Sequence, residues 1–292
     1  MPMIVDLSAP QVTPPERVTS PDGWFAAVVD ATWAGVVLAV DYTASTPLPG
    51  AAAVRKVRML RTDPGAAEPV PVRSADLAWA VEGVGTAYDH EAPLGVAVVY
   101  TATPQYADGT WGPSSSLAVA LPSPVPPADV WIKSLDTPAL SVRVTALSWP
   151  KLSWAARSES ANPRGGAYPM VGQDVYSAAT SDLVLDAQGP EIERLRRLLL
   201  TPGVLLMQTR PETHRPDAFV VLGDVEEELD GPPEETRTFT TSVTEVARPD
   251  TAGQPMRAPG WTYDSVPGQF ATYDAVTGSY ASYAALSTNG VT

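Results

Sequence analysis

Apolar residues between Trp24 and Leu121 occur in short, β-branched runs separated by Gly, Pro and Asp. Runs of this length with turn residues between them are typical of strands in an all-β domain, and they give no helix signal. The pattern predicts strands at residues 25–29, 35–42, 54–61, 78–81, 94–103 and 116–121.

The last two predicted strands carry a more specific pattern. The segment 99–102, followed by Asp108-Gly109, Gly112 and 114–116, resembles the last hairpin of a fibronectin type III or related immunoglobulin-like sandwich. Proline is concentrated directly afterwards, at 122–127, and proline cannot donate a hydrogen bond to a strand ladder. We therefore predict an N-terminal β-sandwich over residues 1–122 and a Pro-rich linker over residues 123–129.

A second pattern of alternation begins after the linker. Leu140, Val142 and Val144 alternate with polar residues, as in a half-buried strand. Further strands are expected at residues 204–208, 219–222 and 237–247, with an acidic loop around residues 226–230.

One segment has the signals of a helix. Pro190 stands where a first helical position would be, acidic residues follow in the first turn, and Arg residues come later. Ile192, Leu195 and Leu199 share one face, so we predict a helix over 190–201 that lies against a sheet. Residues 130–248 are thus expected to form a second β-sandwich with one flanking helix, and the fold class is mainly β.

Residues 249–292 are predicted to form a C-terminal arm with an aromatic repeat. Thr262-Tyr263, Thr272-Tyr273 and Ser282-Tyr283 follow one another with a ten-residue period. The residues expected to dock on a partner are Trp261, Tyr263, Phe270, Tyr273, Tyr280 and Tyr283. The copies fit either short helical turns capped by Thr or Ser, which we favour, or an extended arm whose aromatics fill pockets.

This arm has too few aliphatic residues to fold alone, and aromatic side chains left in water are unfavourable. It is therefore expected to lie on other protein surface. That surface is either its own domains or another subunit, and we favour the second.

Composition limits the partners of the chain. A net charge of −14 repels phosphate backbones and anionic lipid, so we expect no nucleic acid and no membrane as partner. No apolar stretch is long enough to cross a bilayer, and the first residues do not resemble a signal peptide. With no Cys, disulfides, thiolate nucleophiles and Cys-type zinc sites are excluded, which fits assembly in a reducing cytoplasm.

Catalytic, cofactor and metal motifs are missing from the sequence, so no catalytic residue, cofactor or metal site is predicted. His90 lies in Tyr88-Asp89-His90-Glu91, but consecutive strand residues point to alternate faces and do not converge on one ion. His214 lies in a polar loop and is expected to be solvated. The acidic run near residue 226 lacks the spacing of an EF-hand and is interpreted as a solvated turn.

The order and spacing of several segments carry a family resemblance. These segments are 88–95 leading into 98–101, 182–185, 194–199 with 202–206, 239–249 and the Tyr-rich repeat. Together they resemble minor tail proteins of actinobacterial siphophages, over most of the chain from about residue 54. The resemblance implies a distal-tail-like component of the tail tip or baseplate, located in the virion tail and assembled in the host cytoplasm.

The same resemblance implies a homo-oligomeric ring of six or three copies, in contact with the tail tube, the hub and other minor tail proteins. The predicted function is therefore structural and not enzymatic, with a role in host attachment. One alternative is a carbohydrate-binding module for host cell-wall glycans, in which exposed tryptophans form a sugar-stacking platform. Against it, tryptophan in a sandwich is more often a core residue. The other alternative is a tail-associated glycan hydrolase with two facing carboxylates.

Overall fold

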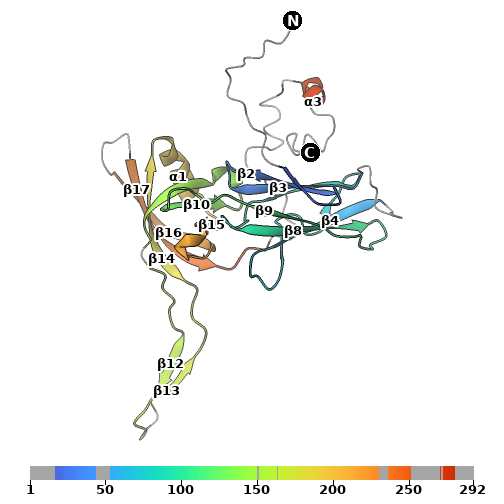
Figure 1. Cartoon of the computed structure of the whole chain (residues 1–292). Helices are drawn as coiled ribbons and strands as arrows, with labels where there is room; N and C mark the ends of the chain where they lie inside the picture. The colour runs from blue at the N-terminus through green and yellow to red at the C-terminus, as the bar shows by residue number, and fades with distance from the viewer. Residues whose placement is uncertain are drawn as a thin grey trace.

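The computed structural model describes residues 17–43, 53–149, 151–162, 164–229, 236–250, 270 and 272–279. Within these ranges the chain is mainly β, as the hydrophobic pattern predicts, and it contains two α-helices. Figure 1 shows a sandwich, a barrel beside it, and a two-stranded ribbon that extends away from both.

The N-terminal part forms a sandwich of two antiparallel sheets. One sheet has the order β1 (Arg17–Thr19), β2 (Phe25–Asp30), β3 (Gly35–Asp41) and β7 (Val84–Asp89). The other has the order β5 (Val70–Pro71), β4 (Val54–Thr62), β8 (Ala97–Tyr106) and β9 (Ser115–Ala120), and β6 (Ala78–Trp79) pairs with β4. The chain changes sheet between β3 and β4, between β6 and β7 and between β7 and β8, which is the kind of connection found in immunoglobulin-like sandwiches.

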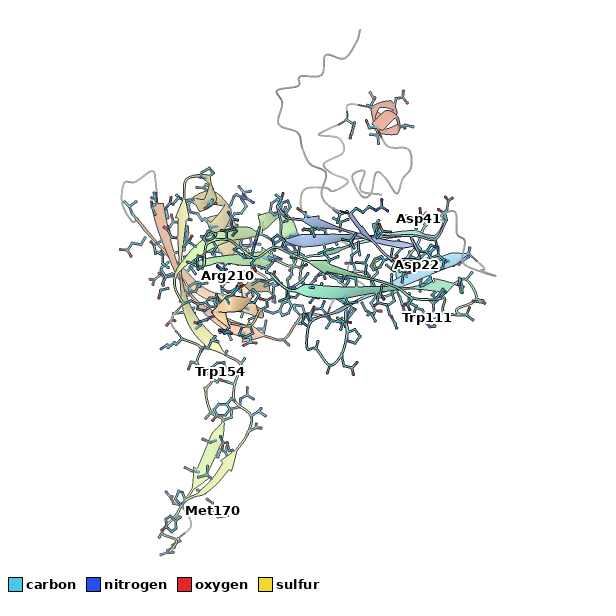
Figure 2. The ribbon with its side chains drawn as sticks, viewed as in Figure 1. Asp22, Asp41, Trp111, Trp154, Met170 and Arg210 are labelled. Atoms are coloured by element: carbon cyan, nitrogen blue, oxygen red, sulfur yellow. The ribbon has the colours of Figure 1, made fainter. Side chains whose placement is uncertain are left out.

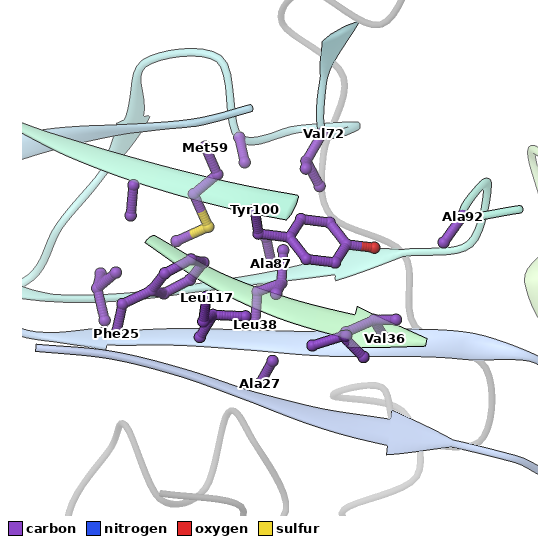
Figure 3. Close-up of a cluster of buried hydrophobic side chains, with 14 of the residues drawn as sticks. Phe25, Ala27, Val36, Leu38, Met59, Val72, Ala87, Ala92, Tyr100 and Leu117 are labelled. Atoms are coloured by element: carbon purple, nitrogen blue, oxygen red, sulfur yellow. The ribbon is translucent and has the colours of Figure 1, made fainter. Parts of the chain in front are cut away.

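Alternating burial explains why these segments are strands. Val57 and Met59 of β4 and Tyr100 of β8 point inward, while their neighbours point outward. Figure 3 shows Met59 and Tyr100 packing against Phe25 and Leu38 of the opposite sheet. The six predicted strands are all present in part or in full, and the predicted hairpin is formed by β8 and β9.

Strand β7 is not predicted by the hydrophobic pattern. Its buried positions include Gly85 and Ala87, which give a weak apolar signal. A Cβ atom at Gly85 would lie 3.2 Å from Val40 Cγ2, so the packing between β7 and β3 favours a residue without a side chain here. The small residues that allow this tight packing give only a weak hydrophobic signal, so the strand cannot be recognised from the sequence pattern.

The second domain is a closed barrel. Its strands follow the order β10 (Asp129–Ser134), β11 (Val142–Ser148), β14 (Thr180–Gln188), β17 (Thr236–Val246), β16 (Ala218–Leu229) and β15 (Leu205–Gln208), and β15 pairs again with β10. The alternating side chains of β14, Leu183 and Leu185, are fully buried inside it. The predicted sandwich strands are thus present, but they close into one sheet, a solution that leaves no edge strand in the barrel.

Helix α1 (Pro190–Leu200) covers the barrel, as predicted, and ends one residue earlier than expected. Pro190 occupies its first turn and Glu191 and Glu193 follow, in agreement with the helix dipole. The predicted inward residues Ile192, Leu195 and Leu199 are buried in the barrel cluster.

All six residues of β10 are buried, because this strand has no solvent-facing side. Val130 and Ile132 belong to the barrel core, whereas Trp131 packs in the core of the sandwich. Strand β10 therefore serves both hydrophobic cores at once, directly after the Pro-rich segment.

The predicted acidic loop near residue 226 is wrong for Glu226 to Glu228. These residues continue β16 and pair with Thr240, Phe239 and Thr238 of β17. Glu227 forms ion pairs with Arg196 of α1 at 2.6 Å and with Arg237 at 3.4 Å. Arg196 and Arg237 thus accommodate the charge of Glu227, while Glu226 and Glu228 remain exposed on the strand.

The ribbon comprises β12 (Ser158–Ala161) and β13 (Met170–Gln173), inserted between β11 and β14 of the barrel. The ladder continues towards the barrel through Asp174 to Arg157, Ser177 to Ala155 and Ser153 to Thr180. Every residue of both ribbon strands is exposed. Figure 2 shows Trp154 at its base and Met170 near its tip.

Candidate functional site

The aromatic residues predicted to dock on a partner fall mostly beyond the described ranges. The ones outside them are Trp261, Tyr263, Tyr280 and Tyr283. Phe270 is partly buried, and Tyr273 is the first residue of α3 (Tyr273–Ser279). The backbone N–H of Ala275 donates to Thr272 Oγ1 at 3.3 Å, which confirms a short helix capped by Thr in this copy of the repeat. The docking role of these six residues remains a prediction.

The ribbon carries an exposed apolar surface that the sequence does not predict. Large apolar side chains that are more than half exposed are Trp154, Tyr168, Met170, Val171, Val175 and Tyr176. A two-stranded ribbon without other cover is only marginally stable in water. Residues 151–178 hold three basic and two acidic residues, a net charge of +1, which leaves −15 for the rest of the chain.

A cluster of polar side chains lies buried between the barrel and the sandwich. Lys133 of β10 is 0% exposed, and its Nζ donates to the carbonyl oxygens of Ala34 at 2.6 Å and His90 at 3.0 Å. Both acceptors belong to the sandwich. Burial lowers the pKa of Lys133 to about 7, against the opposing effect of Asp89 and other carboxylates.

Two buried carboxylates hold the sandwich side of this cluster. Asp89 accepts two hydrogen bonds from Arg61 Nη1, at 3.1 and 2.9 Å, and one from Tyr100 Oη at 2.8 Å. Burial alone would raise the pKa of Asp89, but the Arg61 guanidinium, together with the hydrogen bonds from the Glu91 N–H and Tyr100 Oη, outweighs this, and the pKa lies below its ordinary value. Glu91 pairs with Arg73 at 2.8 Å and with Arg248 at 2.6 Å.

Further contacts tie the two domains together. Gln208 of β15 donates to the carbonyl oxygen of Ala92 at 3.0 Å. Arg248, just after β17, also donates to the carbonyl oxygen of Pro71 at 2.9 Å. The guanidinium of Arg194 in α1 lies 5.4 Å from the ring centre of Trp33. The cluster thus works as a joint that fixes the barrel against the sandwich.

The two histidines differ in their surroundings. His90 is buried, and its Nε2 lies 2.8 Å from Ser141 Oγ. Burial, together with Lys133 and Arg73, lowers its pKa well below the ordinary value, so the ring is neutral. His90 lies beyond the end of β7, so the strand alternation expected for it stops at Asp89. His214 is exposed in the β15–β16 loop, as predicted.

The expectation that tryptophans occupy the core is wrong for several of them. Trp131 is buried, but Trp79, Trp111 and Trp154 are 68%, 45% and 53% exposed. Sequence reasoning missed their exposure because residue type alone does not say whether a side chain faces the core or the solvent; Trp111 and Trp154 lie outside the named strands. It also missed Lys133, although a cation directly after the apolar run Val130-Trp131-Ile132 in the same strand is a signal of a buried, paired charge.

Across the described ranges, no group of three or more His, Cys, Asp or Glu side chains is arranged to hold a metal ion. Neither helix in those ranges is long and apolar enough to cross a membrane. No protein-family model and no curated protein matches this chain.

Proposed function

We propose that the chain is a structural minor tail protein of a siphophage tail tip or baseplate, which forms or joins a distal ring and docks neighbouring tail proteins. The observation that carries this proposal is the ribbon. It projects from a closed barrel and exposes apolar side chains over its whole length. Covering this apolar surface with a partner lowers the free energy of the system, and it also stabilises the ribbon itself.

The charge distribution supports a second copy of the chain as one partner. The ribbon is slightly basic and the rest of the chain is strongly acidic. Attraction between the two favours contact between the ribbon of one copy and the body of another, whereas repulsion between the acidic bodies disfavours direct contact between them. The joint between barrel and sandwich supports the same role, because it presents both domains to a partner as one unit.

Assembly is tested by sedimentation velocity of the full-length chain over a range of concentrations. We expect oligomers that weaken when Tyr168, Met170 and Val171 are replaced together by Ser, Thr and Thr. The matched control is Val99→Thr, an exposed apolar residue of the sandwich. Equal assembly of the triple variant and the wild type would show that the ribbon is not the contact.

The place in the virion needs a separate measurement. Antibodies against the purified chain, with gold-labelled secondary antibody, are expected to mark the tail tip of virions of the phage that encodes it. Truncation after residue 259 is expected to leave both domains folded and to weaken incorporation into tails. Absence of the chain from purified virions contradicts the proposal.

A further inference from the structure

Two exposed tryptophans lie on the outer face of the β5-β4-β8-β9 sheet. Trp79 pairs with Lys56 of β4, Lys56 pairs with Gln105 of β8, and Gln105 forms a bridge to Trp111. Residues directly opposite each other in antiparallel strands point to the same side of the sheet. Trp79, Lys56, Gln105 and Trp111 therefore form one row across the sheet, which we call the tryptophan face together with the adjacent Arg58, Thr103 and Ser114.

The direction of this row is fixed by its neighbours. Val57 and Met59 point into the core, so Lys56 and Arg58 point outward. Two cation–π contacts agree with this, because Lys56 Nζ lies 5.0 Å from the ring centre of Trp79 and Arg58 Cζ lies 4.9 Å from that of Trp111. Figure 2 places Trp111 at the end of the sandwich away from the barrel.

The loop that carries Trp111 is held in place without a ligand. The backbone N–H and hydroxyl of Thr110 both donate to Asp108 Oδ1, at 2.9 and 2.7 Å. A Cβ atom at Gly112 would lie 2.6 Å from Tyr106 Oη, so the chain after Trp111 is pressed against Tyr106. A side chain positioned in advance loses less entropy on binding.

The polar groups of the tryptophan face match the hydroxyls of a sugar. Thr103 Oγ1 and Ser114 Oγ form a pair 2.8 Å apart, and each keeps capacity for a further hydrogen bond. Gln105 donates through Nε2 to the carbonyl oxygen of Gly109 at 3.2 Å, which leaves its Oε1 as an acceptor. Pyranose rings have apolar C–H faces that pack on indole, and hydroxyl edges that exchange hydrogen bonds with groups of this kind.

The spacing and charge restrict the ligand further. Three interstrand spacings separate the two tryptophan backbones, or about 14 Å, so a ligand that reaches both is an oligomer and not a single ring. Lys56 and Arg58 lie between the tryptophans on a chain of net charge −14. Arg58 shares its charge with Asp76 at 2.8 Å. The cations favour a ligand that carries carboxylate or phosphate groups.

We infer that the tryptophan face binds a linear glycan with acidic substituents, laid across the strands from Trp79 to Trp111. This inference does not depend on the proposed tail function, since it uses only the sandwich. The hydroxyl pair of Thr103 and Ser114 and the amide oxygen of Gln105 suit the ring hydroxyls of a glycan, which favours a glycan over a nucleic acid on this face.

The test uses the full-length chain and two probes of equal length, hexagalacturonate as the acidic glycan and maltohexaose as the neutral one. Titration followed by tryptophan fluorescence and isothermal calorimetry is expected to show binding of hexagalacturonate at least tenfold tighter than maltohexaose, and no binding of monomeric galacturonate. The double variant Trp79→Ala/Trp111→Ala is expected to weaken hexagalacturonate binding at least tenfold, and Lys56→Gln to weaken it several-fold.

The control variant is Trp154→Ala, an exposed tryptophan of the ribbon, and it is expected to change binding less than twofold. Unchanged thermal unfolding of the double variant establishes that the fold is intact. The inference is overturned if neither hexasaccharide binds, if hexagalacturonate binding survives the double variant, or if the two hexasaccharides bind equally. Preferential binding of a single-stranded hexadeoxynucleotide at the same tryptophans also overturns it.

Discussion

Lys133 has no contact with bulk water, so its protonation is coupled to folding. Its pKa is about 7 in the folded protein and about 10.4 in an unfolded chain. Between these values the unfolded chain binds more protons, and stability rises with pH through this group. Lys133→Met removes the coupling. The unfolding free energy of the wild type minus that of the variant should therefore increase with pH by up to about 1.4 kcal/mol per unit from pH 7 towards 10.

Urea denaturation of both proteins over this pH range measures the difference. Lys151→Met, at an exposed lysine, is the matched control for the loss of one positive charge. A wild-type minus Lys133→Met difference that stays level, or falls, as pH rises contradicts the prediction.

Asp89 and Asp76 allow a comparison of the same substitution in two environments. Asp89 is 1% exposed and pairs with the buried Arg61, whereas Asp76 and its partner Arg58 are each 38% exposed in their side chains. Asp89→Asn leaves Asp63 as the one anionic partner of the buried guanidinium among the described residues, and should reduce the free energy of unfolding by about 3 kcal/mol. Asp76→Asn should change it by less than about 1 kcal/mol. Chemical denaturation at neutral pH checks both, and similar losses for the two variants would falsify the assignment.

At the scale of elements, the ribbon and the barrel strands should differ in local stability. The ribbon amides bond only within one hairpin, and their side chains are exposed, so local opening is expected to be easy. Strands β14 and β17 pair over nine residues inside the closed barrel and should open only with the whole domain. Hydrogen–deuterium exchange of the monomer is expected to show fast exchange in β12 and β13 and slow exchange in β14 and β17.

The same measurement on the assembled oligomer is expected to show protection of the ribbon. If ribbon amides are as protected in the monomer as those of β14, the ribbon is stable without a partner, and its marginal stability no longer supports a role in assembly. Protection that does not change on assembly places the contact elsewhere.

Elements with a strong local pattern could be predicted, and elements defined by distant contacts could not. Helix α1 was found because Pro190, the acidic first turn and the apolar stripe all lie within one short segment. Closure of the barrel depends on pairing between β10 and β15, for which neither segment carries a local signal. The ribbon was missed because its apolar residues have no buried face to give them a period.

In the candidate surfaces, too, features with a local sequence signal were predictable and features that depend on distant contacts were not. The tryptophans were recognisable as candidates from residue type. Their exposure was not, because the direction of Trp79, for example, depends on the strand pairing that places it opposite the outward-facing Lys56. The capped turn at Thr272 was predictable because an N-cap is a local feature. The buried joint was not predictable, because it combines β10, the end of β7 and the segment after β17.

At the scale of the whole molecule, this joint should make the two domains unfold together. Lys133, Gln208 and Arg248 each donate from the barrel side to backbone or carboxylate oxygens of the sandwich. Unfolding one domain would remove the partners of buried polar groups in the other and uncover apolar side chains of the shared strand β10, so separate unfolding of either domain is unfavourable. Differential scanning calorimetry of the full chain is expected to give one transition, with equal calorimetric and van't Hoff enthalpies.

Weakening the joint should separate the two transitions. Gln208→Leu with Arg248→Ala removes three of the hydrogen bonds between the domains, to Ala92, Glu91 and Pro71, but leaves each core intact. The matched control is Arg196→Ala, which breaks ion pairs within the barrel and should lower the midpoint of a single transition. Two transitions in the wild type would show that the domains are not coupled, and one unaltered transition in the double variant would show that the cores and not the polar joint couple them. A single wild-type transition that divides only in the double variant assigns that coupling to the buried polar side chains between the barrel and the sandwich.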